Sequence, residues 1–276
     1  MSSLYAVSPA EAKTMDTQTL RNQFLMSGLV QNDACNLVYT QYDRMIIGCV
    51  NPVLQELRLP LLDDLKATYF LERRELGIIN VAGNGKVKAD GTTYNLSKLD
   101  CLYLGKGTNE ILFTSDDNNQ PAVYFLLSCP AHHTYENRLM TKDEALPVEM
   151  GNSENSNERT IYKYIHNDGI TSCQLVMGLT VLKHGSVWNT MPAHIHGRRM
   201  EAYFYFDVKD QQCVFHLMGL PTETRHLVVA NYNAIVSPPW SIHSGCGTSN
   251  YSFIWGMAGE NKDFTDMDGV NIIELK

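Results

Sequence analysis

The sequence predicts an all-β protein made of two jelly-roll-like β-barrels, with short helices at the N-terminus. Short runs of β-branched and aromatic residues recur between turn residues along most of the chain, which is typical of sandwiches and barrels. The length, 276 residues, suits two domains of about 100–150 residues each. A polar stretch, 150–158, is the best candidate for a linker between them.

The N-terminal segment carries two helix signals. Ser8 and Glu11 have capping-box spacing, with Pro9 at the first helical position. A second helix is expected to begin near Asp16 and to end before Gly28. We expect these helices to form lids or subunit contacts and to take no part in catalysis.

Strands are predicted throughout the remainder. Asp90-Gly91 between two alternating runs is a strong hairpin signal. The other predicted strands lie at 45–50, 76–81, 86–89, 92–96, 101–104, 111–114, 122–127, 173–182, 201–206, 213–217, 226–229, 234–236 and 251–256.

Composition excludes several classes of partner. The net charge of −8 argues against nucleic acid, because phosphate binding needs clustered Lys and Arg. No apolar run approaches the length of about 18 residues that a membrane span needs, and no signal peptide is apparent. The seven cysteines are odd in number and form no C-x-x-C pair, so we expect buried thiols in a reducing compartment, the cytoplasm.

Four residues form the strongest candidate site. His194 and His196 alternate as residues on one strand face do, about 7 Å apart along the chain, so both can reach one ion. Glu201 opens a run that strongly favours a strand, and His243 follows a proline-rich turn. We predict that these four side chains bind one divalent metal. Three imidazoles and a carboxylate suit Zn, Fe, Mn, Ni or Cu.

The same residues carry a family resemblance. The pattern H-x-H-x4-E, at 194–201, and the pattern P-x-W-x2-H, at 238–243, resemble the two motifs of the cupin superfamily. The resemblance implies two cupin-type barrels, an arrangement known as a bicupin. Further segments resemble the 4-deoxy-L-threo-5-hexosulose-uronate ketol-isomerase family, and the match extends over nearly the whole chain. They lie at 70–77, 188–192, 222–226, 240–245, 253–257 and 266–268.

This resemblance implies a metal-dependent aldose–ketose isomerase. Its substrate would be 5-dehydro-4-deoxy-D-glucuronate, its product 3-deoxy-D-glycero-2,5-hexodiulosonate, and its pathway the breakdown of pectin-type sugars. The expected cofactor is one Zn²⁺ per subunit, although other divalent metals suit the ligands. The resemblance also implies a homohexamer.

Candidate acid–base and substrate-binding residues lie near the metal motif. The predicted catalytic residues are Glu201, Tyr203, Tyr205 and Arg199. Tyr203 and Tyr205 share the strand parity of Glu201 and should face the interior with it. A tyrosine could transfer the proton only if its pKa fell well below about 10. Glu72, Glu75 and a metal-bound hydroxide are alternatives. The predicted substrate-binding residues are Arg198, Arg225 and Trp240.

A faint internal repeat relates residues 73–81 to residues 198–206. In the first half, His132 and His133 are adjacent, so they would point to opposite faces of a strand. We therefore predict a helical arm and a metal-free barrel in residues 1–150, and a metal-binding barrel in residues 151–276.

Ligand chemistry alone leaves other functions open. Three histidines and one glutamate also hold iron in cupin dioxygenases, and a bicupin can bind or store sugar without catalysis. Oxygen uptake would favour the dioxygenase. Full function after replacement of His243 would favour the non-catalytic protein. Only the whole-chain resemblance favours the isomerase over these alternatives.

Overall fold

The computed structural model describes residues 3–263 and 265–276, which divide into two compact units. The first contains Leu29–Leu146 and Lys163–Met177, and the second contains Leu4–Gly28, Pro147–Tyr162 and Gly178–Lys276. The predicted division at residue 150 differs from this arrangement. The N-terminal arm belongs to the second unit, because its last residues join a sheet there, and residues 163–177 belong to the first.

The first unit consists of two antiparallel sheets. Its strands are β2 (Ala34–Tyr39), β3 (Ile46–Asn51), β4 (Leu57–Arg58), β5 (Arg74–Asn80), β6 (Gly85–Ala89), β7 (Thr92–Leu96), β8 (Cys101–Leu104), β9 (Ile111–Ser115), β10 (Tyr124–Pro130) and β11 (Arg138–Met140), with a 3-10 turn at Asp63–Leu65. Six strands form one sheet in the order β11-β8-β5-β10-β3-β2, and four form another in the order β4-β9-β6-β7. Apolar side chains from both sheets, such as Ile78 and Phe113, form one buried core.

The hairpin predicted at Asp90-Gly91 is confirmed. It joins β6 to β7, and both turn residues have positive φ, 46° and 86°, as the favoured hairpin turns require.

The second unit carries the helical arm and most of the remaining strands. Its elements are α1 (Pro9–Thr14), α2 (Thr17–Phe24), β1 (Leu25–Met26), β12 (Val148–Met150), β13 (Arg159–Ile165), β14 (Val176–Leu182), β15 (Trp188–Asn189), β16 (His194–Ile195), β17 (Arg199–Phe206), β18 (Val214–Leu220), β19 (Glu223–Val229), β20 (Asn233–Ser237), β21 (Ser244–Gly247), β22 (Ser252–Gly259), β23 (Asp268–Gly269) and a 3-10 turn at Ile272–Glu274. A seven-stranded sheet has the order β1-β20-β17-β22-β14-β13-β12, and a four-stranded sheet has the order β15-β21-β18-β19. Strands β16 and β23 pair separately.

The fold class is the predicted one: nearly all β, with jelly-roll sheets and two short helices. The predicted barrels are open, however. Within the described chain, the larger and smaller sheets of each unit keep separate edge strands and do not pair into a closed barrel.

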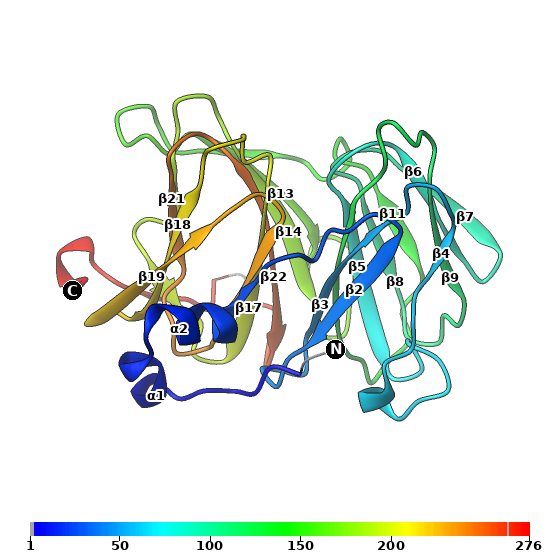
Figure 1. Cartoon of the computed structure of the whole chain (residues 1–276), viewed down its shortest axis with the longest axis horizontal. Coiled ribbons are helices and arrows are strands. Elements are labelled where there is room, and N and C mark those ends of the chain that lie inside the picture. Colours follow the sequence, from blue (N-terminus) through cyan, green and yellow to red (C-terminus); the bar gives the residue numbers. More distant parts are fainter. Residues whose placement is uncertain (1–2, 264) are drawn as a thin grey trace. The chain divides into compact units, whose positions relative to one another are not determined.

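The two N-terminal helices are capped as predicted and lie within the second unit. Ser8 and Glu11 form a complete capping box, and the Asp16 side chain accepts a hydrogen bond from the backbone of Thr19. Figure 1 shows both helices in blue. Along the chain they precede β1, and α1 contacts β18 while α2 contacts β20. Among the described residues, no helix is both long and apolar enough to span a membrane.

A buried carboxylate organises the first unit. Glu75, on β5, is fully buried and accepts hydrogen bonds from the backbone N–H groups of Cys173, Gln174 and Leu175 at 2.7, 2.9 and 2.8 Å. The Tyr103 hydroxyl donates a fourth bond at 2.8 Å. Since a buried charge is costly unless it is hydrogen-bonded, these contacts fix residues 173–175 against β5.

Candidate metal centre and pocket

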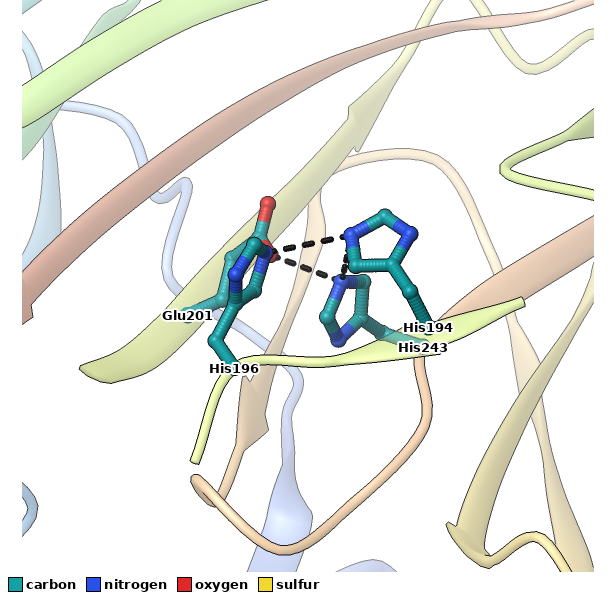
Figure 2. Close-up of side chains that lie close together, drawn as sticks. All are labelled: His194, His196, Glu201 and His243. Atoms are coloured by element: carbon teal, nitrogen blue, oxygen red, sulfur yellow. Dashed lines mark hydrogen bonds and ion pairs between the residues drawn. The ribbon is translucent and has the colours of Figure 1, made fainter. Parts of the chain in front are cut away.

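The four residues predicted as metal ligands converge in the second unit (Figure 2). His194 lies on β16, His196 follows that strand, Glu201 lies on β17 and His243 precedes β21. The His194 Nε2 atom is 3.1 Å from His196 Nε2 and 3.0 Å from His243 Nε2. The Glu201 Oε2 atom is 3.2 Å from His196 Nε2 and 2.9 Å from His243 Nε2.

Local packing explains why residues about fifty positions apart meet. The neighbours Ala193 and Ile242 pack with Val270 in a small buried cluster, which places His194 next to His243. Glu201 lies on β17, between β20 and β22. The residue paired with Glu201 on β20 is Ser237, and its hydroxyl lies 3.4 Å from Nδ1 of His243.

The donor set fits a divalent cation. Zinc–ligand distances of about 2.0–2.1 Å in a tetrahedron place neighbouring ligand atoms about 3.3 Å apart, close to the separations in this cluster. The Nδ1 atom of His196 lies 2.9 Å from the carbonyl oxygen of Asp266, which can only accept a hydrogen bond. When Nδ1 donates to this carbonyl, the Nε2 lone pair faces the cluster. The buried oxygen Oε2 of Glu201 has imidazole nitrogens as its close neighbours and no hydrogen-bond partner among the described residues, so a cation would complete its environment.

The ionisation of the cluster favours metal binding. Burial, together with the neighbouring His243, lowers the pKa of His194 to about 3. Burial alone would raise the pKa of Glu201, but His243 and His196 outweigh it, and the pKa lies well below its usual value. Near neutral pH, His194 is therefore neutral and Glu201 is anionic, the forms that bind metals.

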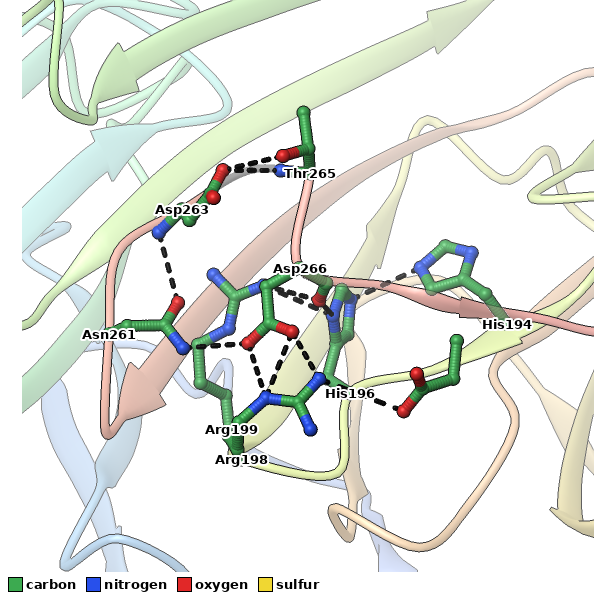
Figure 3. A network of polar contacts seen from close by, with 9 residues as sticks. His194, His196, Arg198, Arg199, Asn261, Asp263, Thr265 and Asp266 are labelled. Atoms are coloured by element: carbon green, nitrogen blue, oxygen red, sulfur yellow. Dashed lines mark hydrogen bonds and ion pairs between the residues drawn. The ribbon is translucent and has the colours of Figure 1, made fainter.

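A network of polar contacts supports His196 from outside the cluster (Figure 3). The Asp266 carbonyl accepts hydrogen bonds from His196 Nδ1 and from the Arg199 guanidinium, at 2.9 and 3.0 Å. The Asp266 carboxylate pairs with Arg198, whose Nε lies 2.8 Å away, and accepts a 2.6 Å hydrogen bond from Asn261. Partners of this kind orient a metal-binding imidazole and raise its affinity.

A pocket of about 250 Å³ opens over the cluster. Its volume lies near the small end of the range for ligand sites, which suits a single sugar unit better than a polymer. Most of the side chains around it are apolar. The lining residues are Met150, Arg159, Ile161, Thr180, Thr190, Met191, Pro192, His194, His196, Glu201, Tyr203, Phe253, Trp255, Met257 and Met267.

The two tyrosines predicted as acid–base candidates have different surroundings. Tyr203 lines the pocket, and its ring centroid lies 5.6 Å from that of His243. Tyr205 lies deeper, where its hydroxyl is 2.7 Å from Nδ1 of the buried His216. Burial raises the pKa of both tyrosines, the opposite of the shift that proton abstraction would need.

Two predicted substrate-binding residues hold the N-terminal arm instead. Arg225 donates hydrogen bonds to the carbonyls of residues 12, 13 and 15, at 3.2, 3.3 and 2.7 Å. The Trp240 indole donates to the carbonyl of Val7, and its ring packs edge-on against Phe24. Arg225 lies within β19 and Trp240 lies between β20 and β21, and both side chains contact the N-terminal arm instead of the pocket.

Arg198 and Arg199 also differ from their predicted roles. Arg198 is exposed and paired with Asp266, and it does not line the pocket. Arg199 is buried and does not line the pocket, and its guanidinium shares the Asp266 carbonyl with His196, so it lies behind a ligand and not where a substrate would bind.

Sequence reasoning missed two residues of this site. Asp266 acts through its backbone carbonyl, which no side-chain motif reveals. Arg159 directly follows the polar stretch predicted to be a linker, yet it lines the pocket. The run that it opens, 159–165, is rich in β-branched and aromatic residues, and that composition is the signal that could have indicated a strand there.

The chain is similar to proteins of known family. The KduI/IolB family is matched over residues 31–271. The 4-deoxy-L-threo-5-hexosulose-uronate ketol-isomerase of Formosa agariphila is 54% identical over 274 residues, which cover 99% of this chain and 98% of the relative. The enzyme of the same name from Shouchella clausii is 53% identical over 272 residues, 99% of each chain.

Solved structures support the fold. An IolB-like protein from Salmonella typhimurium LT2 superposes with a TM-score of 0.68 at 15% identity, over 90% of this chain and 96% of that one. The vicilin of Solanum lycopersicum superposes with a TM-score of 0.54 at 10% identity, over 79% of this chain and 75% of the vicilin chain. With a match over most of its length and relatives more than 50% identical, the chain belongs to the KduI/IolB family.

Proposed function

We propose that this chain is a metal-dependent aldose–ketose isomerase that converts 5-dehydro-4-deoxy-D-glucuronate to 3-deoxy-D-glycero-2,5-hexodiulosonate in the breakdown of pectin-type sugars. The observation that carries the proposal is the buried cluster of three imidazoles and one carboxylate at the base of a pocket of monosaccharide size. Relatives named for this reaction, at more than 50% identity, support the substrate.

The reaction takes a proton from the carbon next to an aldehyde and returns it one carbon away. His194, His196, Glu201 and His243 would hold one Zn²⁺. When bound, this ion supplies Lewis-acid stabilisation of the negative charge that develops on the substrate oxygens. The chain's own groups bind and orient the sugar, and the apolar walls of the pocket limit access of water.

Tyr203 has a separate role in this proposal. Its side chain lines the same pocket as Glu201, two residues away on β17. A protonated phenol donates a hydrogen bond to a substrate oxygen, which favours charge on that oxygen.

The decisive experiment combines metal analysis with an isomerase assay. We expect about one zinc per chain, loss of turnover after chelation, and recovery when zinc is restored. His243→Gln should lose both metal and turnover, whereas the control His226→Gln, at an exposed position on β19, should lose neither. Undiminished turnover in metal-free protein would reject the proposal, and oxygen consumption coupled to turnover would favour a dioxygenase.

The proposal also covers the cellular compartment and the oligomeric state. All seven cysteines are free thiols, which supports a reducing compartment, the cytoplasm. The proposed assembly is a homohexamer, and light scattering on the purified protein would test it.

A further inference from the structure

One cationic side chain lies in the pocket and has no part in the metal cluster. Arg159 begins β13, and its side chain lines the pocket together with Ile161, which shares its strand face. Within the described pocket lining, Arg159 is the only Lys or Arg. The arginines nearest the metal cluster in sequence, Arg198 and Arg199, do not belong to the lining.

Arg159 lies across the sheet from the cluster. Glu201 lies on β17 and Arg159 on β13, and the strand order is β17-β22-β14-β13. Three inter-strand spacings therefore separate their backbones, a distance of about 14 Å. Between them the pocket floor is formed by Thr180 on β14 and Trp255 on β22. Side chains reaching inwards from both ends shorten this distance. A six-carbon chain spans roughly 6–7 Å, since each carbon–carbon bond is about 1.5 Å long.

The guanidinium of Arg159 is available for an anion. Among the described residues its hydrogen-bond partner is the carbonyl of Asn157, at 2.9 Å, and no carboxylate forms an ion pair with it. The nearest acidic residue along the paired strand β12, Glu149, binds Lys183 and the hydroxyl of Thr160 instead. Arg159 is also half-buried, and burial lowers its pKa, so a partner anion would relieve a desolvation cost.

We propose that Arg159 binds the substrate carboxylate at the end of the pocket opposite the metal cluster. This inference rests on the proposed function, which supplies a substrate with an aldehyde at one end and a carboxylate at the other. The planar guanidinium pairs with a carboxylate through two parallel hydrogen bonds, so it fixes orientation as well as affinity. Arg159 thereby selects uronates over neutral sugars and places the aldehyde end at the cluster.

The test compares Arg159→Gln, Arg159→Lys and the control Arg138→Gln, an exposed arginine in the first unit. For Arg159→Gln we expect KM for 5-dehydro-4-deoxy-D-glucuronate to rise roughly 10- to 100-fold, because a charge-assisted hydrogen-bond pair is lost. Zinc content should stay at the wild-type value. Arg159→Lys should show a smaller rise, because the charge remains without the fork, and Arg138→Gln should show none.

A second measurement uses the wild-type protein and the carboxamide of the substrate. Wild type should prefer the carboxylate by roughly the same 10- to 100-fold in kcat/KM, and this preference should collapse in Arg159→Gln. If Arg159→Gln does not fold, the wild-type preference and Arg159→Lys decide the question.

The outcomes separate the two proposals. A wild-type protein without isomerase activity would reject the proposed function and the inference with it. An active wild type whose KM changes less than about threefold in Arg159→Gln, or which treats carboxylate and carboxamide alike, would overturn the inference and leave the function standing.

Discussion

Replacing Asp266 by alanine tests whether contacts outside the cluster set its metal affinity. The carboxylate of Asp266 is held by Arg198 and Asn261, and this anchorage positions the backbone carbonyl that accepts the Nδ1 proton of His196. Asp266→Ala keeps the carbonyl but removes both anchors. Loss of such a supporting contact typically costs 10- to 100-fold in metal affinity, which corresponds to about 1.4–2.7 kcal/mol.

The measurement is a competition titration of metal-free protein against a chromogenic zinc chelator. Asp268→Ala is the matched control. Its carboxylate is exposed and approaches Arg198 only to 3.7 Å, and the hydrogen bonds found for His196 among the described residues do not include it. We expect weaker zinc binding in Asp266→Ala alone. An affinity within about threefold of wild type, or an equal loss in the two variants, would refute the idea that this network orients His196.

Three other predictions follow from the surroundings of buried groups. Tyr205→Phe should lower the free energy of unfolding by about 1–3 kcal/mol in urea titrations, because His216 loses its hydrogen-bond partner, and turnover should stay near the wild-type value. Tyr203→Phe should instead lower kcat and leave the zinc content unchanged. Burial lowers the pKa of His216 to about 3, so the contribution of neutral His216 to stability is complete above about pH 6.5 and declines as the pH falls towards 3. Between pH 6.5 and 5, the free energy of unfolding of the chelated protein should fall by about 2 kcal/mol because of His216. A His216→Asn variant whose stability has the same dependence on pH would contradict this. Arg225→Gln should speed proteolytic cleavage within residues 4–28 and leave KM unchanged, whereas a large rise in KM would restore its predicted substrate role.

Residues whose function depends on strand parity and motif spacing were predictable. His194 lies on a two-residue strand that His196 follows, and Glu201 lies near the start of a long one, so local geometry already constrains three of the four residues. His243 required the motif, because only tertiary packing of its neighbour Ile242 against Ala193 brings it to the others.

The direction of two candidate side chains was not predictable. Arg225 and Trp240 lie in segments that resemble the family, but the N-terminal arm covers the face that they occupy. Nothing in the local sequence indicates that residues 4–28 pack there, because the contacts span more than 200 positions. The same reason explains the missed role of Arg159, since its place in the pocket depends on the order β17-β22-β14-β13, which no local pattern specifies.

The saturated carboxylate of Glu75 has a consequence for protein engineering. A designer who wished to add a second zinc centre to the first unit would naturally start from β5, whose opening residues resemble those of β17. Glu75 already satisfies three main-chain amides and a phenol, so recruiting it as a ligand would strip the 173–175 segment of its acceptors. Introduced histidines would therefore need a newly placed carboxylate, and transplanting the H-x-H pair alone should yield a destabilised protein without stoichiometric metal.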